Sequence, residues 1–570
     1  MIFRGNLRRL AASLVVVIAM AAPATAQHEH HGHGAEALPG RHVMPPMPAG
    51  MPMLPALMGE VPPVSAWLPA FGLSAADFPA AEPSRTVELA DGDTLDLVPS
   101  PVRRTIRGRE YLMYGYNNQY PGPLIKAPQG ARVMIRVRNE IEWPTTIHWH
   151  GIRLQSQFDG VPGLTQPPIA PGETFLYEID VPDDGMFWYH PHARADVQQD
   201  LGLYGNLLVL PSAGVQAEEA RHFHREELLT LDDLLISAGG ELVPYGEEAP
   251  THALMGRFGN VVFVNGETDL RLEADRGEVI RFYLTNVANA RTFAVRFGNA
   301  RVKLVGSDLG PYETEQWVES VIIAPAERYA VDVRFPEAGD VAITNTIQVI
   351  DPFKGEFFPS VDTLAVVSVA SSDASPDLRA KHGTLRHRPG VAEDIDNFRS
   401  HSDRAPDFDL IATVRTRNLP TAITLHMEQD TFYVPPVEWE DPMPEMNWLS
   451  TGAQVTWILR DAESLLENDR IHWTFQQGDI VKIRIFNDPR SFHPMNHPIH
   501  VHGQRFLVVK RDGIPQTNLV WKDTANLPVG STMELVVEMS NPGDWMLHCH
   551  INEHLGSGMH MHFTVEPADD

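Results

Sequence analysis

Histidine pairs and one cysteine are the residues of this 570-residue chain whose types and spacing could do chemistry. The chain contains 26 histidines but a single cysteine, Cys549. The pattern His-x-His occurs, among other places, at His148–His150, His190–His192, His500–His502 and His548–His550, and these four segments are the histidine pairs considered for chemistry. On a strand, residues i and i+2 point to the same side, so each pair presents two imidazoles in one direction. Together the four pairs offer eight imidazoles, which suit a histidine-bound copper cluster.

A second kind of site centres on Cys549. His554 and Met559 follow the cysteine, and His497 precedes the third histidine pair at a spacing of three residues. A thiolate with two imidazoles and a weak axial thioether is typical of a blue-copper electron-transfer centre. Because Cys549 lies inside the fourth histidine pair, it points to the opposite side of its strand from its two neighbours. A few covalent bonds would therefore join the two sites, which gives a short path for electrons.

The segments that position these residues repeat three times along the chain. Each begins with a glycine, continues as an alternating apolar strand and reaches an asparagine nine residues later, at 130–139, 277–286 and 478–487. A second pair of marks, thirteen residues apart, follows each strand, at 172–185, 326–339 and 530–543. Such constant spacing indicates triplication of one unit. Short alternating strands with Gly and Pro turns predict that this unit is a β-sandwich, and helical patterns are sparse, with one possible short helix over 217–229.

The histidine pairs occupy corresponding places in the first and third repeats. The second repeat has Asn289–Phe293 and Ala342–Asn345 where histidines would stand, so we expect it to bind no copper and to act as a spacer. A single His-x-His pattern is more often a chance surface feature or an adventitious metal site than a functional metal site. Ten of the 26 histidines fall in these segments, and independent placement does not account for that.

The motifs HWHG, HPH, HPIHVHG and HCHINEHLGSGM resemble the four copper signatures of the three-domain multicopper oxidases, the laccase and cuprous-oxidase group. The resemblance covers about residues 85–567. It implies an all-β fold of three consecutive cupredoxin-like Greek-key β-sandwich domains. Their expected ranges are 86–213 and 408–570 for the two copper-binding domains and 214–370 for the copper-free one, with a linker over 371–407.

The resemblance also implies four copper ions, and no cofactor beyond copper is expected. The type 1 copper would be bound by His497, Cys549, His554 and axial Met559. The type 2 copper would be bound by His148 and His500. The two type 3 coppers would be bound by His150, His190 and His550 and by His192, His502 and His548, although the division between these two ions stays open.

The implied reaction is one-electron oxidation of a substrate at type 1, electron transfer through Cys549 and its neighbours His548 and His550, and reduction of O2 to water at the cluster. Protons are needed, and Asp159 matches the family's acidic residue near the cluster; the alternative is an ordinary Asp-Gly turn residue. Glu553 is a further candidate for proton entry, although a solvated or structural carboxylate is the commoner explanation.

Several functions are compatible with this machinery. The first is a laccase-like oxidase that uses O2 and a small phenol; the axial Met559 predicts a moderate type 1 potential, because a thioether donates to copper. The second is a cuprous oxidase in periplasmic copper tolerance, with Cu(I) as the reducing substrate. The histidines at 28–33, the methionines at 44–58 and the predicted export favour it. An acidic Met-containing loop at 426–446 is a further candidate for metal collection, although a solvated acidic loop is the commoner explanation. A non-catalytic cupredoxin scaffold is disfavoured because every ligand position is filled.

The first 26 residues predict export. Arg4, Arg8 and Arg9 precede an apolar run over 10–22 and an Ala-Thr-Ala site, which is typical of a secretory signal peptide. Arg8 and Arg9 leave a twin-arginine route open as an alternative to the general one. The apolar run is shorter than the ~20 residues that span a bilayer, so we expect a periplasmic or secreted protein without stable membrane insertion.

Residues 27–85 form a His/Met/Pro-rich tail, for which low-complexity disorder and copper capture are compatible interpretations.

Composition excludes other classes of function. One cysteine excludes a disulfide framework and a Cys-rich zinc site. The net charge of −29 repels phosphate backbones, so no nucleic-acid partner is expected.

Overall fold

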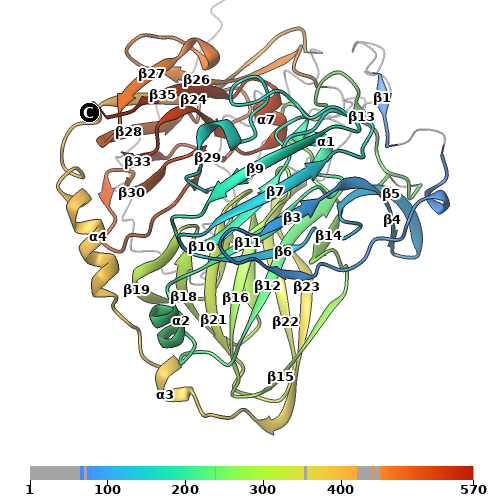
Figure 1. Cartoon of the computed structure of the whole chain (residues 1–570), viewed down its shortest axis with the longest axis vertical. Helices are drawn as coiled ribbons and strands as arrows, with labels where there is room; N and C mark the ends of the chain where they lie inside the picture. The colour runs from blue at the N-terminus through green and yellow to red at the C-terminus, as the bar shows by residue number, and fades with distance from the viewer. Residues whose placement is uncertain are drawn as a thin grey trace, which may run out of the picture.

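The computed structural model of this chain describes residues 65–69, 73–237, 239–351, 356–419, 439–440 and 450–568. The predicted signal peptide, the histidine and methionine runs at 28–58 and the loop at 426–446, apart from the backbone of 439–440, lie outside these residues. Within the described part of the chain, no helix is both long and apolar enough to cross a membrane. Strands dominate, and the three predicted repeats fall in successive groups of sheets (Figure 1).

The first group carries two of the histidine pairs. Its five-stranded sheet has the order β2 (Thr86–Glu88), β6 (Leu124–Pro128), β11 (Gly205–Leu210), β10 (Gly185–His190) and β8 (His148–His150). A second sheet contains β3 (Thr94–Leu97), β7 (Arg132–Arg138) and β9 (Thr174–Asp180), and a hairpin joins β4 (Pro99–Ile106) to β5 (Arg109–Tyr116). Short helix α1 (Ala195–Gln198) follows β10, and β1 (Ala66–Trp67) pairs with β13 (Tyr245–Gly246).

The second group has two long sheets. One has the order β14 (Val261–Val264), β12 (Arg225–Leu234), β16 (Val279–Asn286), β21 (Arg328–Arg334), β18 (Arg301–Ser307) and β19 (Gly310–Val318). The other has the order β15 (Leu270–Arg276), β23 (Glu356–Asp373), β22 (Gly339–Asp351), β17 (Phe293–Phe297) and β20 (Val321–Ile323). The two-residue strand β25 (Trp439–Glu440) pairs with β22.

The third group repeats this arrangement. One sheet has the order β26 (Val455–Asp461), β24 (Phe408–Thr416), β28 (Asp479–Asn487), β33 (Thr532–Met539), β30 (Arg505–Arg511) and β31 (Ile514–Pro515). The other has the order β27 (His472–Gln476), β35 (His560–Glu566), β34 (Gly543–Cys549), β29 (His497–Val501) and β32 (Thr524–Leu527). Helix α7 (Asn552–Gly556) lies between β34 and β35.

The repeated asparagines explain why the three units fold alike. Asn139, Asn286 and Asn487 are each fully or almost fully buried. Each side-chain amide donates to two carbonyls, one in the loop that follows its strand and one 30–40 residues further along the chain. Buried amides must be paired in this way. The same residue type therefore links the same two segments in each of the three repeats.

The first residue of each second pair of repeat marks hydrogen-bonds to the backbone of the repeated asparagine. The backbone N–H groups of Gly172, Ala326 and Gly530 donate to the carbonyls of the three asparagines over 2.8, 2.8 and 3.1 Å. All three have positive φ, between 70° and 83°, which favours glycine at the first and third places. The strands between the marks pair antiparallel as β7 with β9, β16 with β21 and β28 with β33. The predicted triplication is therefore visible in the hydrogen bonds.

The structure differs from the sequence predictions at 217–229 and adds two helices within 371–407. The possible helix over 217–229 is wrong at its C-terminal end: α2 spans Ala213–Glu219, and β12 starts at Arg225. The register explains this, because residues 225–229 of β12 pair in parallel with residues 280–284 of β16 and gain ladder hydrogen bonds there. Residues 371–407 contain α3 (Arg379–His382) and α4 (Pro389–Arg399), and the predicted domain boundaries stay predictions.

Candidate metal centre

The four histidine pairs meet between the first and third groups of sheets. Strand β8 lies antiparallel to β10, with His148 opposite His190, and β29 lies antiparallel to β34, with His500 opposite His548. Seven of the eight rings are at most 1% exposed, and His192 is partly exposed. The strands thus bring pairs of the first group against pairs of the third, with His148 and His500 lying 352 residues apart in the sequence.

Imidazole nitrogens face one another inside this group. Nε2 of His148 lies 3.4 Å from Nε2 of His500, and Nε2 of His502 lies 3.0 Å from Nε2 of His548. The ring centre of His550 lies 5.0 Å from that of His150 and 5.1 Å from that of His190. Sets with ligand atoms within 4.8 Å of one another include His148–His150–His190, His148–His500–His502 and His192–His502–His548.

The opposite nitrogens of these rings are held by oxygen atoms. The Nδ1 atoms of His148, His190, His500 and His548 lie 2.8–2.9 Å from backbone carbonyl oxygens. An oxygen acceptor receives a proton from the nitrogen that faces it, so the other nitrogen keeps a free lone pair. The backbone therefore selects the tautomer that a metal ion needs in four of the eight rings.

Buried nitrogens without a hydrogen-bond partner test whether a metal fits. They include Nδ1 of His150, Nε2 of His190 and His192 and both ring nitrogens of His550. Buried polar atoms are normally paired, and a shared cation would satisfy several of these at once. Burial lowers the pKa of His502 to about 4 and that of His550 to about 3, which keeps both rings neutral. Neutral imidazoles without thiols suit copper, so the residues of the histidine cluster fit bound copper ions.

Cys549 forms a separate donor set. Its Sγ lies 3.5 Å from Nδ1 of His497 and 3.7 Å from Nδ1 of His554, and all three residues are buried. The backbone of Met559 accepts a hydrogen bond from Cys549 N–H and donates one to the carbonyl of His554. Met559 is fully buried, and His497 rather than His493 belongs to the donor set with Cys549 and His554. The structure thus brings His497 and His554 to the Cys549 thiol, and the axial role of Met559 stays a prediction.

The surroundings of Cys549 are apolar. Burial raises the pKa of the Cys549 thiol well above its ordinary value, so the thiolate needs a cation to form. The ring of Trp457 stacks on that of His554 at 3.9 Å between centres, and its indole N–H donates to the carbonyl of Ala253 over 2.7 Å. Sequence reasoning missed Trp457, because no spacing relates it to the histidine motifs.

Asp159 lies within the histidine group. It is fully buried, and its Oδ2 lies 2.8 Å from Nδ1 of His502, while Oδ1 lies 3.3 Å from Nδ1 of His148. Burial raises the pKa of Asp159, but its interactions with His502 and His148 outweigh that effect and hold the pKa well below its ordinary value. The side chain is therefore more than a turn residue, because it orients one imidazole and borders a second.

Glu553 is neither solvated nor exposed. It is 1% exposed, and its Oε1 accepts a hydrogen bond from Nδ2 of Asn289 over 3.1 Å. Burial, with smaller contributions from Asp196 and Asp200, raises the pKa of Glu553 to about 8. Asn289 occupies the position in the second repeat that corresponds to a histidine in the first and third. Its amide connects the second repeat to Glu553 of α7 and to the carbonyl of Asp196.

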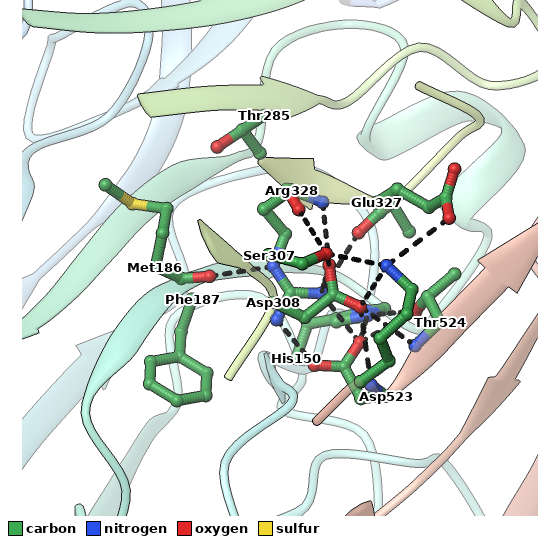
Figure 2. Close-up of polar contacts among 12 residues, drawn as sticks. His150, Met186, Phe187, Thr285, Ser307, Asp308, Glu327, Arg328, Asp523 and Thr524 are labelled. Atoms are coloured by element: carbon green, nitrogen blue, oxygen red, sulfur yellow. Dashed lines mark hydrogen bonds and ion pairs between the residues drawn. The ribbon is translucent and has the colours of Figure 1, made fainter. Parts of the chain in front are cut away.

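A network of charges that the sequence did not reveal borders the histidines (Figure 2). Oδ1 of Asp523 lies 2.9 Å from Nε2 of His150, and Arg328 of the second repeat donates to both oxygens of the same carboxylate. Asp308 and Lys522 extend the network. These residues belong to no repeated spacing or metal motif, which explains why sequence reasoning missed them.

Comparisons with known proteins agree with this geometry. Two family models, both described as multicopper oxidase, match residues 101–214 and 438–569. Multicopper oxidase MmcO of Mycobacterium tuberculosis is 28% identical over 494 residues, which cover 82% of this chain and 86% of that protein. Laccase-1 of Fomitopsis schrenkii is 26% identical over 493 residues, which cover 83% and 86%.

Two further relatives extend the comparison. The copper resistance protein A homolog of Pseudomonas syringae pv. tomato is 24% identical over 574 residues, which cover 83% of this chain and 92% of that protein. The solved structure of a multicopper oxidase from Campylobacter jejuni, described as a metallo-oxidase, matches with a TM-score of 0.66 at 22% identity, covering 88% and 98%.

The strand arrangement and the structural match define an all-β fold with cupredoxin-like sandwich domains. The chain belongs to the multicopper oxidase family. It is a copper-dependent oxidoreductase.

Proposed function

We propose that this protein is a laccase-like oxidase that couples one-electron oxidation of a small phenol to reduction of O2 to water. The observation that carries this proposal is the pair of buried donor sets, one of imidazoles and one around a thiol, on neighbouring strands of one protein. A non-catalytic scaffold would not need both sets complete.

The residues that would hold four copper ions are those of the predicted sets. Type 1 takes His497, Cys549, His554 and Met559; type 2 takes His148 and His500; the type 3 pair takes His150, His190, His550 and His192, His502, His548. When bound, copper supplies single-electron acceptance at the thiolate site and four-electron reduction of O2 at the cluster of three.

The chain's own residues prepare this chemistry. Backbone carbonyls fix the imidazole tautomers, and burial excludes water from the rings. Cys549 is bonded through the backbone to His548 and His550, so covalent bonds alone connect the two donor sets. Asp159 holds the N–H of His502 and remains ionised beside the cluster, which equips it to attract a proton toward the imidazoles.

The choice of a phenol rests on the axial Met559 and on relatives named as laccases. Cuprous oxidation is the second candidate, because one relative is named a copper resistance protein and one solved structure a metallo-oxidase. The histidine run at 28–33 and the methionine run at 44–58 suit capture of copper ions. We further propose export to the periplasm or the medium through the segment 1–26.

Oxygen uptake by the copper-loaded protein distinguishes the two candidates. Substituted phenols and Cu(I) are offered in parallel, to the mature chain and to a variant without residues 27–85. Phenol turnover without Cu(I) turnover supports the laccase-like proposal. Cu(I) turnover that is lost on truncation, while phenol turnover stays, supports the cuprous oxidase, and no uptake with either substrate contradicts both.

A further inference from the structure

A fully buried arginine of the copper-free second unit lies beside the histidine cluster. Arg328, the first residue of β21, has no exposed surface. Its Nε donates to the carbonyl of Met186 on β10 of the first unit over 2.8 Å. Its two terminal nitrogens donate to Oδ1 and Oδ2 of Asp523, which immediately precedes β32 of the third unit, over 2.6 and 2.5 Å. One guanidinium therefore contacts all three units (Figure 2).

Asp523 passes this orientation on to a histidine of the cluster. Its Oδ1 lies 2.9 Å from Nε2 of His150, and its backbone carbonyl lies 2.9 Å from Nδ1 of His500. The hydroxyl of Thr524 donates to the same Oδ1 over 2.8 Å. A carboxylate that accepts the Nε2 proton of His150 leaves Nδ1 with a free lone pair, and that atom is buried without a partner.

The guanidinium is itself held in place. Asp308 accepts the backbone N–H of Arg328 over 2.9 Å and lies 3.5 Å from its side chain. Nζ of Lys522 lies 3.1 Å from Asp308 and 3.4 Å from Glu327. The five charged groups, namely Arg328 and Lys522 against Asp308, Asp523 and Glu327, form a connected network, which meets the condition for charges to stay buried.

The chain leaves room for this pair at Gly151, directly after His150. A Cβ at Gly151 would lie 2.2 Å from Oδ2 of Asp523 and 2.9 Å from a terminal nitrogen of Arg328. The residue has a φ of 88°, which also favours glycine. The glycine of the HWHG motif thus allows the arginine–carboxylate pair to pack against the backbone of the histidine pair.

We propose that Arg328 is a positioning residue for the copper cluster: it holds the carboxylate of Asp523 in the orientation that fixes His150 as a type 3 ligand through Nδ1. The unit without copper ligands thereby contributes to the cluster. This inference rests on the proposed function, because it assigns His150 to copper. A planar guanidinium that donates to both oxygens fixes the plane of the carboxylate, which a lysine ammonium does not.

Arg281 provides a matched control in the same unit. It is a buried arginine on β16 and donates to both oxygens of Asp332 over 2.7 and 3.0 Å, without contact to the histidines. Arg281 also donates to Glu219 over 2.9 Å, so Arg281→Met reports the general effect of losing a buried arginine together with its carboxylate pairs. Arg328→Met removes the pair beside His150, and Arg328→Lys keeps a positive charge there but not the paired donors.

The experiment loads each full-length apoprotein with Cu(II), and measures bound copper per chain and the EPR-silent fraction, which reports two coupled ions. Partners of ligating histidines typically contribute 10–100-fold to metal affinity, and Arg328 acts through one such partner, so we expect about tenfold weaker binding of the coupled pair. Arg328→Met and Arg328→Lys lose EPR-silent copper at limiting Cu(II) while the blue absorption stays, and Arg281→Met behaves like the wild type.

A copper-free readout accompanies it. In apoprotein labelled with ¹⁵N-histidine, the Nε2–H signal of His150, assigned with His150→Gln, is expected to be slow to exchange in the wild type and in Arg281→Met. It exchanges faster in the Arg328 variants. If Arg328→Met does not fold, Arg328→Lys alone carries both measurements. If Arg328→Lys binds the EPR-silent copper pair as tightly as the wild type and its His150 Nε2–H exchanges as slowly, the positioning role is overturned. If the wild-type protein itself binds no EPR-silent copper, the proposed function is overturned instead.

Discussion

Replacement of Asp159 by asparagine tests how the histidine cluster depends on a buried carboxylate. The variant keeps the shape of the side chain but loses its charge and replaces one acceptor oxygen by an amide. In the wild type, Oδ2 accepts from Nδ1 of His502 over 2.8 Å, and Oδ1 lies 3.3 Å from Nδ1 of His148. An amide NH2 turned toward either ring would oppose the N–H that the present tautomer directs at it.

The expected size of the effect follows from these contacts. Loss of a carboxylate that orients a metal-binding histidine typically costs about 10–100-fold in affinity or activity, or about 1.4–2.7 kcal/mol at 1.36 kcal/mol for each factor of ten. We therefore expect kcat for oxygen uptake to fall by about 10–100-fold in Asp159→Asn. The blue absorption stays, because the Cys549 donor set does not include Asp159.

The assay is steady-state oxygen uptake with a phenol, beside the visible spectrum and the copper content of each variant. Asp461→Asn is the control, because Asp461 is also a buried carboxylate but is bonded to Ser464 and Trp473 rather than to the clustered histidines. A kcat of Asp159→Asn within about twofold of both the wild type and Asp461→Asn would refute the role given to Asp159.

Two further predictions concern the type 1 ligand and acid stability. Met559→Leu removes a donating thioether, so redox titration of the blue band is expected to give a higher type 1 potential; an unchanged or lower potential contradicts the axial assignment. Burial raises the pKa of Glu219, but hydrogen bonds and charges from Arg386, Arg281 and Arg388 outweigh it and hold the pKa below its ordinary value. The stability from this cluster is therefore present above about pH 4.5 and is lost as the pH falls, so Glu219→Gln lowers the midpoint of urea unfolding at pH 7 by more than at pH 4. An equal decrease at both pH values would contradict it.

Periodicity revealed much of the fold because it reflects local hydrogen bonds. The glycine and asparagine marks recur since Asn139, Asn286 and Asn487 each pair with the same kind of loop and strand carbonyl. The end of α2 could not be predicted in the same way: Leu228 and Leu229 fit a helix locally, and only the pairing of β12 with β16, which is distant in the sequence, makes them extended.

The candidate site was predictable to the extent that its residues lie in short motifs. All ten histidines and Cys549 were placed in donor sets by the spacing of His-x-His on strands and by the family resemblance. Asp523, Arg328 and Trp457 were not, because each reaches the site from a separate strand or loop and has no characteristic spacing in the sequence. Their contribution depends on how the three units pack together.

The most direct test of the two-site account is the copper content and the visible spectrum of Cys549→Ser. The account predicts that the wild type binds four copper ions per chain and is intensely blue. Cys549→Ser is predicted to bind about three, to lose the blue absorption and to keep the EPR-silent pair, because the imidazole sets do not use the sulfur. A variant that stays blue, or that loses the EPR-silent pair together with the blue colour, would contradict the separation into a thiolate site and a histidine cluster.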